Sequence, residues 1–335
     1  MAEPWITLAK IVVYAAVVVG ITLLHVAYAT YFERKVIGRM QGRMGPVEVG
    51  YNGLLQPFAD MIKSLFKEDI IPADADRPLF FIAPIIVVAS VITSLSVIPF
   101  FNNGAIADLN AGMLLIFAMA SIAVYGIIIA GWSSNSKFAF FGSIRSAAQV
   151  ISYEIAMGIS VAGVFLMAGS LNLNDIVLAQ REQPLGMFAV LQFIGFVVFV
   201  ISAFAETNRT PFDLPEAETE LVAGYMTEYS GFRYALFFLA EYVSMYIMGA
   251  LVALCYLGGW GVPGFISRSL PFLDIVPGVV WFLIKVYAFM FLYFWVRATL
   301  PRYRFDQLMS IGWKILIPVS VANIILTAAV KRFFM

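Results

Sequence analysis

Acidic side chains crowd one short stretch of this chain, AETNRTPFDLPEAETELVAGYMTEYSG at residues 205–231, which holds a single base, Arg209. The acids of this stretch are Glu206, Asp213, Glu216, Glu218, Glu220 and Glu228. Two further acids, Glu154 and Glu241, stand in apolar runs on either side of it. An ionised carboxylate in hydrocarbon is costly unless it is paired or hydrated. Such acids therefore suit either proton transfer or a hydrogen bond that ties two helices together.

The spacing of three of these acids favours proton transfer. Glu154 precedes seventeen residues without a charge, which places it near the inner end of its apolar run, and Glu206 ends the next run. Glu241 lies eight residues past Arg233, about 12 Å along a helix. One such acid alone serves equally well as a link between helices. A row of three beside an acidic loop favours a proton pathway.

The acidic stretch itself predicts a short helix. Pro215 suits the first turn of a helix, and Asp213 lies where an acid caps the helix end. On that helix Glu216 and Glu220 share one face, whereas Glu218 points elsewhere. The alternative is a solvated acidic loop, but the acids alternate with residues that favour burial: Leu214, Leu221, Val222, Tyr225 and Met226.

The composition sets these acids in a membrane protein. The 335 residues are 61% hydrophobic and 13% charged, against roughly 25% charged residues in soluble proteins. The start, MAEPWITLAK, lacks the features of a cleaved signal peptide, so we expect the first apolar run to remain as a span. A helix needs about 20 residues to cross the hydrocarbon core. We therefore predict one all-α integral membrane domain over residues 1–335, with about eight transmembrane helices at 6–32, 79–101, 112–131, 150–170, 187–205, 233–258, 277–296 and 311–330.

Basic residues orient these spans. Of the 21 Lys and Arg residues, 15 lie in or beside the odd-numbered connections and 5 lie on the opposite side, at Lys10, Arg181, Arg268, Lys331 and Arg332. Positive charge favours the inner side, so both termini face outward and the inner connections are about 33–78, 132–149, 206–232 and 297–310. Lys285 is left inside a span, where we expect it either to reach the interface or to pair with an acid from another span.

The first inner connection contains the segment LLQPFADMIKSLFK at residues 54–67. On a helix its apolar residues, among them Phe58, share one face, and its polar residues, among them Asp60, share the other. This pattern predicts an amphipathic helix that lies in the membrane interface. The alternative is a helix that only covers the end of the bundle.

The chain lacks the ligands of the common redox centres. It has one cysteine, Cys255, and one histidine, His25, both in apolar runs. An iron–sulfur cluster needs about four ligands, and a haem held by two histidines needs one more. We therefore expect no cofactor or metal site in this chain. The formal net charge of zero gives no argument for binding nucleic acid.

The acidic stretch, followed by ALFFLAEY, resembles the signature of the NuoH-type membrane subunit of respiratory complex I, the homologue of mitochondrial subunit 1. Four other segments agree in order and spacing: ERKVIGRMQGRMGP, GLLQPFADMIKSLFKEDIIPADADR, SYEIAMGIS and WVRATLPRYRFDQLMSIGWKILIP. One departure is visible, because the family's G-P-N-x-V-G-P is GPVEVGY here, with Val47 in place of the asparagine and an added charge at Glu48.

The resemblance implies a subunit of proton-pumping NADH:quinone oxidoreductase that forms the entrance and wall of the quinone chamber. Quinone would be the substrate, and NADH, FMN and the iron–sulfur clusters would bind to partner subunits. The partners would be the quinone-site subunits of the hydrophilic arm, the small membrane subunits and the antiporter-like subunits, in a bacterial inner membrane. The residues nearest the quinone would be Glu33, Arg34, Arg39, Phe58 and Asp60. The acids that link the chamber to the proton channels would be Glu154, Glu206, Asp213, Glu216, Glu218, Glu220, Glu228 and Glu241.

Other functions fit parts of the same pattern. The homologous membrane subunit of an energy-converting hydrogenase or formate-oxidising complex shares the architecture but need not bind quinone. A stand-alone ion-coupled transporter would use the acids to bind coupling ions, although its site is expected near the midplane. A purely structural anchor would tolerate neutralisation of the acids.

Overall fold

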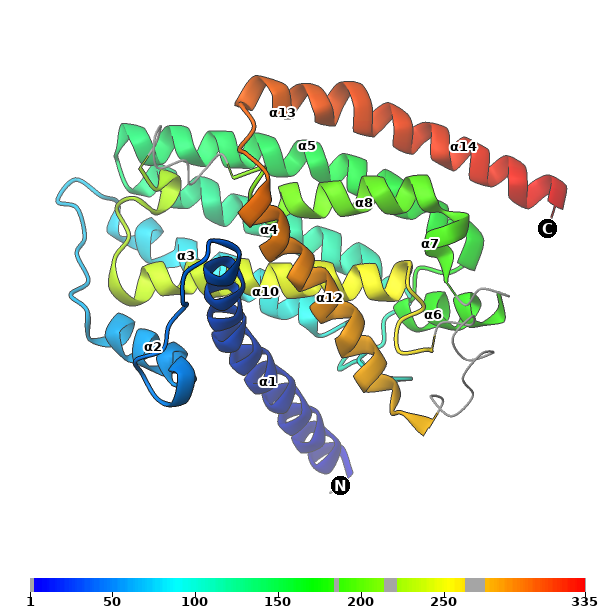
Figure 1. Cartoon of the computed structure of the whole chain (residues 1–335), viewed down its shortest axis with the longest axis horizontal. Helices are drawn as coiled ribbons and strands as arrows, with labels where there is room; N and C mark the ends of the chain where they lie inside the picture. Colours follow the sequence, from blue (N-terminus) through cyan, green and yellow to red (C-terminus); the bar gives the residue numbers. More distant parts are fainter. Residues whose placement is uncertain (1–2, 184–186, 214–221, 263–274, 335) are drawn as a thin grey trace.

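The computed structural model describes residues 3–183, 187–213, 222–262 and 275–334, and these residues form helices joined by short connections (Figure 1). The longer elements are α1 (Glu3–Met40), α2 (Gln56–Phe66), α3 (Arg77–Leu95), α4 (Gly112–Ser133), α5 (Lys137–Ala168), α6 (Leu173–Glu182), α8 (Phe193–Glu206), α10 (Gly231–Cys255), α12 (Gly278–Thr299) and α14 (Ile317–Phe334). The shorter ones are η1 (Tyr51–Gly53), α7 (Phe188–Leu191), η2 (Gly224–Met226), α13 (Phe305–Ile311) and the π-helical η4 (Gly312–Leu316).

The long helices pack side by side around α5 and α10. Helix α4 lies between α3 and α5, and α5 also contacts α8 and α14. Helix α10 contacts α3 on one side and α12 on another, and α12 crosses it obliquely in Figure 1. Helix α1 contacts α10, α12 and α2. Side chains from α1 and α3 through α12 therefore meet in one main buried cluster, which also includes residues of α13 and η4.

Glycines allow the central helices to approach closely. A Cβ at Gly126 of α4 would lie 2.5 Å from a methyl group of Val87 in α3, and one at Gly131 would lie 2.6 Å from the carbonyl oxygen of Ala139 in α5. A Cβ at Gly142 of α5 would lie 2.6 Å from Cα of Gly224 in η2. Small residues at helix contacts are typical of membrane bundles. Here Gly142 and Gly224 also allow the end of the acidic stretch to pack closely against α5.

Within the described part of the chain, seven helices are long and apolar enough to cross a membrane, and each matches one of the predicted spans. The predicted span at 187–205 is divided: α7 ends at Leu191 and α8 covers only Phe193–Glu206. Helix α8 is therefore about 21 Å long, shorter than a hydrocarbon core of about 30 Å. The break occurs at Gln192, whose buried amide bonds to Asn323 and Thr327 of α14. The sequence did not reveal this polar contact inside an apolar run.

Two predicted connections contain more helix than expected. Helix α5 begins at Lys137, so most of the predicted connection 132–149 belongs to it, and Glu154 lies in the middle of the helix and not near its start. Helix α1 continues to Met40, into the predicted connection 33–78. The amphipathic segment forms α2, which contacts α1 and α10 while Met61, Leu65 and Phe66 stay exposed. Its apolar face is therefore open to a membrane surface or a partner.

Candidate functional site

A buried ion network joins helices α1, α10 and α12 to the start of the acidic stretch. Arg209 lies 3.1 Å from Glu33 of α1, and both side chains are less than a tenth exposed. The Glu33 carboxylate also accepts hydrogen bonds from Arg297 of α12 and, at 2.7 Å, from the hydroxyl of Tyr242 in α10. A buried carboxylate is stable when charged donors surround it. Glu33 is therefore held as the centre of a four-residue cluster.

Arg209 also connects this cluster to a second carboxylate. Its guanidinium forms an ion pair with Glu241 and lies over the ring of Tyr242, 4.6 Å from the ring centroid. One guanidinium thus binds carboxylates on two different helices, α1 and α10. The fork of an arginine suits such a double contact, whereas a lysine supplies only a point charge.

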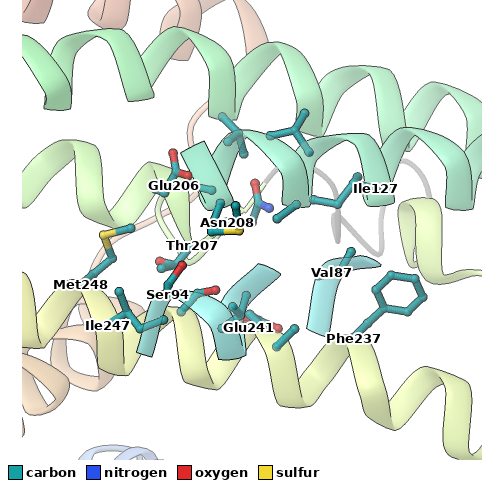
Figure 2. A pocket seen from close by; sticks show the side chains of 18 of the residues that line it. Val87, Ser94, Ile127, Glu206, Thr207, Asn208, Phe237, Glu241, Ile247 and Met248 are labelled. Atoms are coloured by element: carbon teal, nitrogen blue, oxygen red, sulfur yellow. The ribbon is translucent and has the colours of Figure 1, made fainter. Parts of the chain in front are cut away.

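Glu241 faces a small cavity that Glu206 lines as well. The cavity has a volume of about 80 Å³, enough for more than one water molecule. Figure 2 shows Glu206 and Glu241 on opposite sides, with Thr207, Asn208 and Ser94 between them. Glu206 Oε2 is buried and has no hydrogen-bond partner among the described residues. A water in this cavity would supply the missing partner and a route for protons.

Glu154 extends the row of acids. Its Oε1 accepts a hydrogen bond of 2.5 Å from the hydroxyl of Ser121 in α4, and its charge repels that of Glu206. The structure thus brings the three acids of the predicted row, which come from α5, α8 and α10, into one region. Interacting carboxylates in a medium of low dielectric constant bind and release protons as a set.

The rest of the acidic stretch is only partly described. Asp213 forms an ion pair of 2.9 Å with Arg302. Burial raises the pKa of Asp213 above its ordinary value, although the charge of Arg302 acts in the opposite direction. Glu228 is half-buried and makes no hydrogen bond or ion pair with any described residue. The predicted helix after Asp213, with Glu216, Glu218 and Glu220, lies outside the described residues.

Tyr229 fixes the end of the acidic stretch to the core. Its ring stacks on Phe80 of α3 with centroids 4.0 Å apart, and its hydroxyl donates to the Phe80 carbonyl at 3.3 Å. Burial raises the pKa of Tyr229 to about 12, so the side chain stays neutral and bonded over the whole physiological range.

The residues expected beside the quinone divide into three groups. Arg39 lines an open pocket of about 290 Å³ at the end of α1, with Lys35, aromatic side chains and Asn52. Arg34 pairs with Asp60 at 2.7 Å, and Phe58 packs edge-on against Tyr28, so these residues attach α2 to α1. Glu33 belongs to the ion network instead. Only Arg39 of the five therefore lines this pocket.

Lys285 forms no ion pair with an acid among the described residues, although such a pair was one of the two arrangements expected of it. Its ammonium group donates to three carbonyl oxygens just beyond α10, those of Leu257, Gly259 and Gly261, at 2.6, 2.7 and 2.8 Å. These carbonyls belong to the turns that follow α10, and Lys285 supplies them with a donor from α12. The described residues therefore show carbonyl partners for Lys285 and no acid from another span.

Three residues that bind acids of the site do not stand out in the sequence. Tyr242 follows Glu241 directly in the motif AEY, and Arg297 and Arg302 flank the end of α12. Proximity to a motif is the one signal for Tyr242. The two arginines resemble ordinary positive charge on the inner side. Among the described residues, no group of three or more His, Cys, Asp or Glu side chains forms a metal site.

Comparison with known proteins places this architecture in a family. The family model described as NADH dehydrogenase matches residues 13–328. The chain is 53% identical to the H subunit of the NADH-quinone oxidoreductase of Brevibacillus brevis, over 99% of this chain and 96% of that protein. It is 52% identical to the corresponding subunit of Rickettsia typhi, over 95% of this chain and 93% of that protein. It is 50% identical to the corresponding subunit of Anoxybacillus flavithermus, over 97% of this chain and 96% of that protein. The chain therefore belongs to the NADH dehydrogenase family, as an H-type membrane subunit of NADH-quinone oxidoreductase, the respiratory complex I.

Proposed function

We propose that this subunit links quinone chemistry at the end of α1 to proton movement along Glu241, Glu206 and Glu154. The single observation that carries the proposal is the position of Arg209, which binds Glu33 on one side and Glu241 on the other. Glu33 belongs to the segment that faces the quinone in the family pattern. Glu241 lines the cavity that leads to Glu206. The Arg209 side chain thus connects the proposed quinone side of the subunit with the proposed proton path.

The coupling follows from the sharing of one positive charge by two carboxylates. When Glu33 takes up a proton, its attraction for Arg209 falls, and Arg209 is left to stabilise the ionised form of Glu241. When Glu241 takes up a proton, Arg209 stabilises ionised Glu33 instead. Burial makes each step strong, because charges interact more in a low dielectric. A change of charge beside the quinone therefore changes the proton affinity of the path.

The path continues through the cavity. The cavity lined by Thr207, Asn208 and Ser94 is large enough to hold water, and a proton released by Glu241 is proposed to reach Glu206 through it. Glu206 and Glu154 repel each other, so a proton on one favours ionisation of the other. The two carboxylates therefore favour sharing one proton, which can move from one to the other. Asp213, Glu216, Glu218, Glu220 and Glu228 are proposed to extend the path within the acidic stretch.

The proposal includes the setting of the subunit. Both termini face outward across a bacterial inner membrane, and the ion network lies toward the inner side. Quinone enters beside α2 and the pocket lined by Arg39, with Arg34, Phe58 and Asp60 holding α2 in place. Flavin and iron–sulfur clusters reside in partner subunits of the hydrophilic arm, and the protons pass to antiporter-like membrane subunits. These assignments are supported by the family and by the arrangement of charges.

The alternatives are less well supported. A membrane subunit of a hydrogenase or formate-oxidising complex would share the helices, but the relatives from Brevibacillus, Anoxybacillus and Rickettsia are named as subunits of NADH-quinone oxidoreductase. A stand-alone transporter disagrees with membership of a family of complex subunits.

The test is a mild-detergent purification of the chain, followed by assay of NADH:quinone reductase activity with and without a quinone-site inhibitor. Recovery of flavin and iron–sulfur subunits with inhibitor-sensitive activity is expected. In the same preparation, Glu33→Gln should lower both quinone turnover and proton pumping, because it removes one of the two carboxylates that share Arg209. A chain that purifies alone, or with a nickel hydrogenase, overturns the quinone half of the proposal.

A further inference from the structure

We propose that Gln149 is a positioning residue that holds Arg209 between its two carboxylates. Gln149 belongs to α5 and is completely buried, and among the described residues its hydrogen bonds go to the segment around Arg209 and not to the ion network itself. The inference rests on the proposed role of Arg209, and it adds a neutral side chain that no charge pattern reveals.

The side-chain amide of Gln149 binds three points of one segment. Its Nε2 donates to the carbonyl oxygens of Ala205 at 2.8 Å and Phe212 at 2.7 Å, and it lies 3.2 Å from Oδ1 of Asn208. Two amide hydrogens thus serve three acceptors. Asn208 in turn donates from Nδ2 to the hydroxyl of Ser146, one turn earlier in α5, at 3.2 Å. Helix α5 therefore fastens the segment from Ala205 to Phe212 at both ends and in the middle.

Arg209 lies inside this fastened segment. It directly follows Asn208, which has a left-handed backbone with φ of 49°. Its own backbone N–H donates to the Phe204 carbonyl at 3.2 Å, and its carbonyl accepts from Phe212 N–H at 2.8 Å. This tight loop fixes the direction of the Arg209 side chain. It can do so only as long as the hydrogen bonds to α5 hold the loop in place. An arginine shared by two helices needs such a fixed origin, because a shift of about 1 Å at a reacting group is costly.

The chemistry of an amide suits this position better than any charged group. Three oxygens converge on Nε2, so a donor is required and a carboxylate would be repelled. A cation there would compete with Arg209 for the acids. Gln149 supplies donors without a charge, which leaves the balance of the ion network to its arginines and acids.

Two substitutions in the complete, assembled complex test the proposal. Gln149→Met keeps the size and removes both donors, and it should lower NADH:quinone reductase activity about tenfold or more. Gln149→Glu introduces a group that donates one hydrogen bond when protonated and none when ionised. Its activity relative to wild type should therefore rise as the pH falls, whereas the relative activity of Gln149→Met should stay flat.

The matched control is Gln192→Met. Gln192 is also buried and bonded through its amide, but to Thr327 and Asn323 of α14. This variant should lose stability while its activity per assembled complex stays within about twofold of wild type, without the acid-dependent recovery. An equal loss of activity in Gln192→Met would overturn the proposal, because the effect would then be general to buried amides.

Hydrogen exchange of the backbone amides 205–213 separates this proposal from the proton path. Faster exchange with loss of quinone reductase activity in Gln149→Met supports the positioning role. If the residual activity of Gln149→Met still pumps the normal number of protons per electron, that result would count against the proton path but not against the positioning role. Wild-type activity in both Gln149 variants overturns the positioning role. So does failure of both to assemble at every pH while Gln192→Met assembles, because Gln149 would then act on folding.

Discussion

Arg209 and Glu33 form an ion pair of 3.1 Å although 176 residues separate them in the sequence, and both side chains are less than a tenth exposed. The pair joins the first helix of the chain to the acidic stretch, which carries six of the 21 acids. The desolvation cost of a buried pair is offset only by good geometry and additional hydrogen bonds, which Arg297 and Tyr242 provide. An arrangement of this cost points to function more than to stability.

Removing the shared cation should be among the most damaging single changes in the network. Arg209→Met leaves Glu33 and Glu241 without their common partner, and breaking a buried pair costs about 3–5 kcal/mol. We expect assembled complex to fall sharply and the remainder to lose quinone reductase activity. The control is Arg34→Met, whose ion pair with Asp60 is half exposed and should cost about 1 kcal/mol or less. Thermal inactivation of both variants measures the difference, and equal stability losses would contradict the account.

The hydroxyl of Tyr242 should matter through Glu33. Tyr242→Phe removes a hydrogen bond of 2.7 Å to a buried carboxylate, which costs about 1–3 kcal/mol. Turnover should fall about tenfold with little change in the amount of assembled complex. Tyr125→Phe alters an exposed tyrosine of α4 and serves as the control. Steady-state assays at saturating quinone make the comparison, and unchanged turnover in Tyr242→Phe would remove this residue from the network.

Asp213 gives a prediction for pH. Burial raises its pKa in the folded protein above the ordinary value of 3.8, so the folded state binds this proton more tightly than the unfolded state. Its contribution to stability is therefore fully present below the unfolded pKa and is lost as the pH rises through the raised folded value. Asp213→Asn removes this dependence. As the pH rises from about 4, the thermal inactivation temperature of the variant should therefore increase relative to that of the wild type. A gap that widens toward acid pH instead would show that Arg302 dominates over burial.

Lys285 should be structural. Lys285→Met leaves the carbonyls of Leu257, Gly259 and Gly261 without their donor, and each buried unsatisfied group costs about 1–3 kcal/mol. We expect less assembled complex and a lower inactivation temperature, but normal turnover for each complex that assembles. Lys314→Met, at an exposed lysine of η4, should change neither. If Lys285→Met lowered the turnover of each assembled complex and left the inactivation temperature unchanged, Lys285 would instead belong to the proton path.

The sequence predicted the class of the fold, and it singled out the three acids that the structure brings together in the candidate site, because both depend on local patterns. Long apolar runs produced seven of the expected helices, and isolated acids in those runs marked Glu154, Glu206 and Glu241. What the sequence did not reveal are contacts between distant helices. Arg297 and Arg302 resemble ordinary inner-side charges until the fold brings Glu33 and Asp213 beside them.

Polar residues without charge were the other gap. Gln192 divides a run that reads as one span, and Gln149 fastens the loop of Arg209, yet neither stands out in composition or periodicity. Their roles depend on the single acceptor or donor that the tertiary structure places opposite each amide. The middle position of Glu154 in α5 was missed for a similar reason, because residues 137–149 are polar enough to resemble a connection but are packed against α4 and η2.

The central claim is that protons pass between Glu241 and Glu206 in response to the charge at Glu33. The most direct measurement is the number of protons pumped per electron, together with turnover, for Glu241→Gln and Glu206→Gln in assembled complex reconstituted into vesicles. Glu182→Gln, at the exposed end of α6, is the control. The account predicts normal assembly in all three, and turnover lowered about a hundredfold in the first two alone, with pumping lost. Normal coupled pumping in assembled Glu241→Gln complex would contradict it.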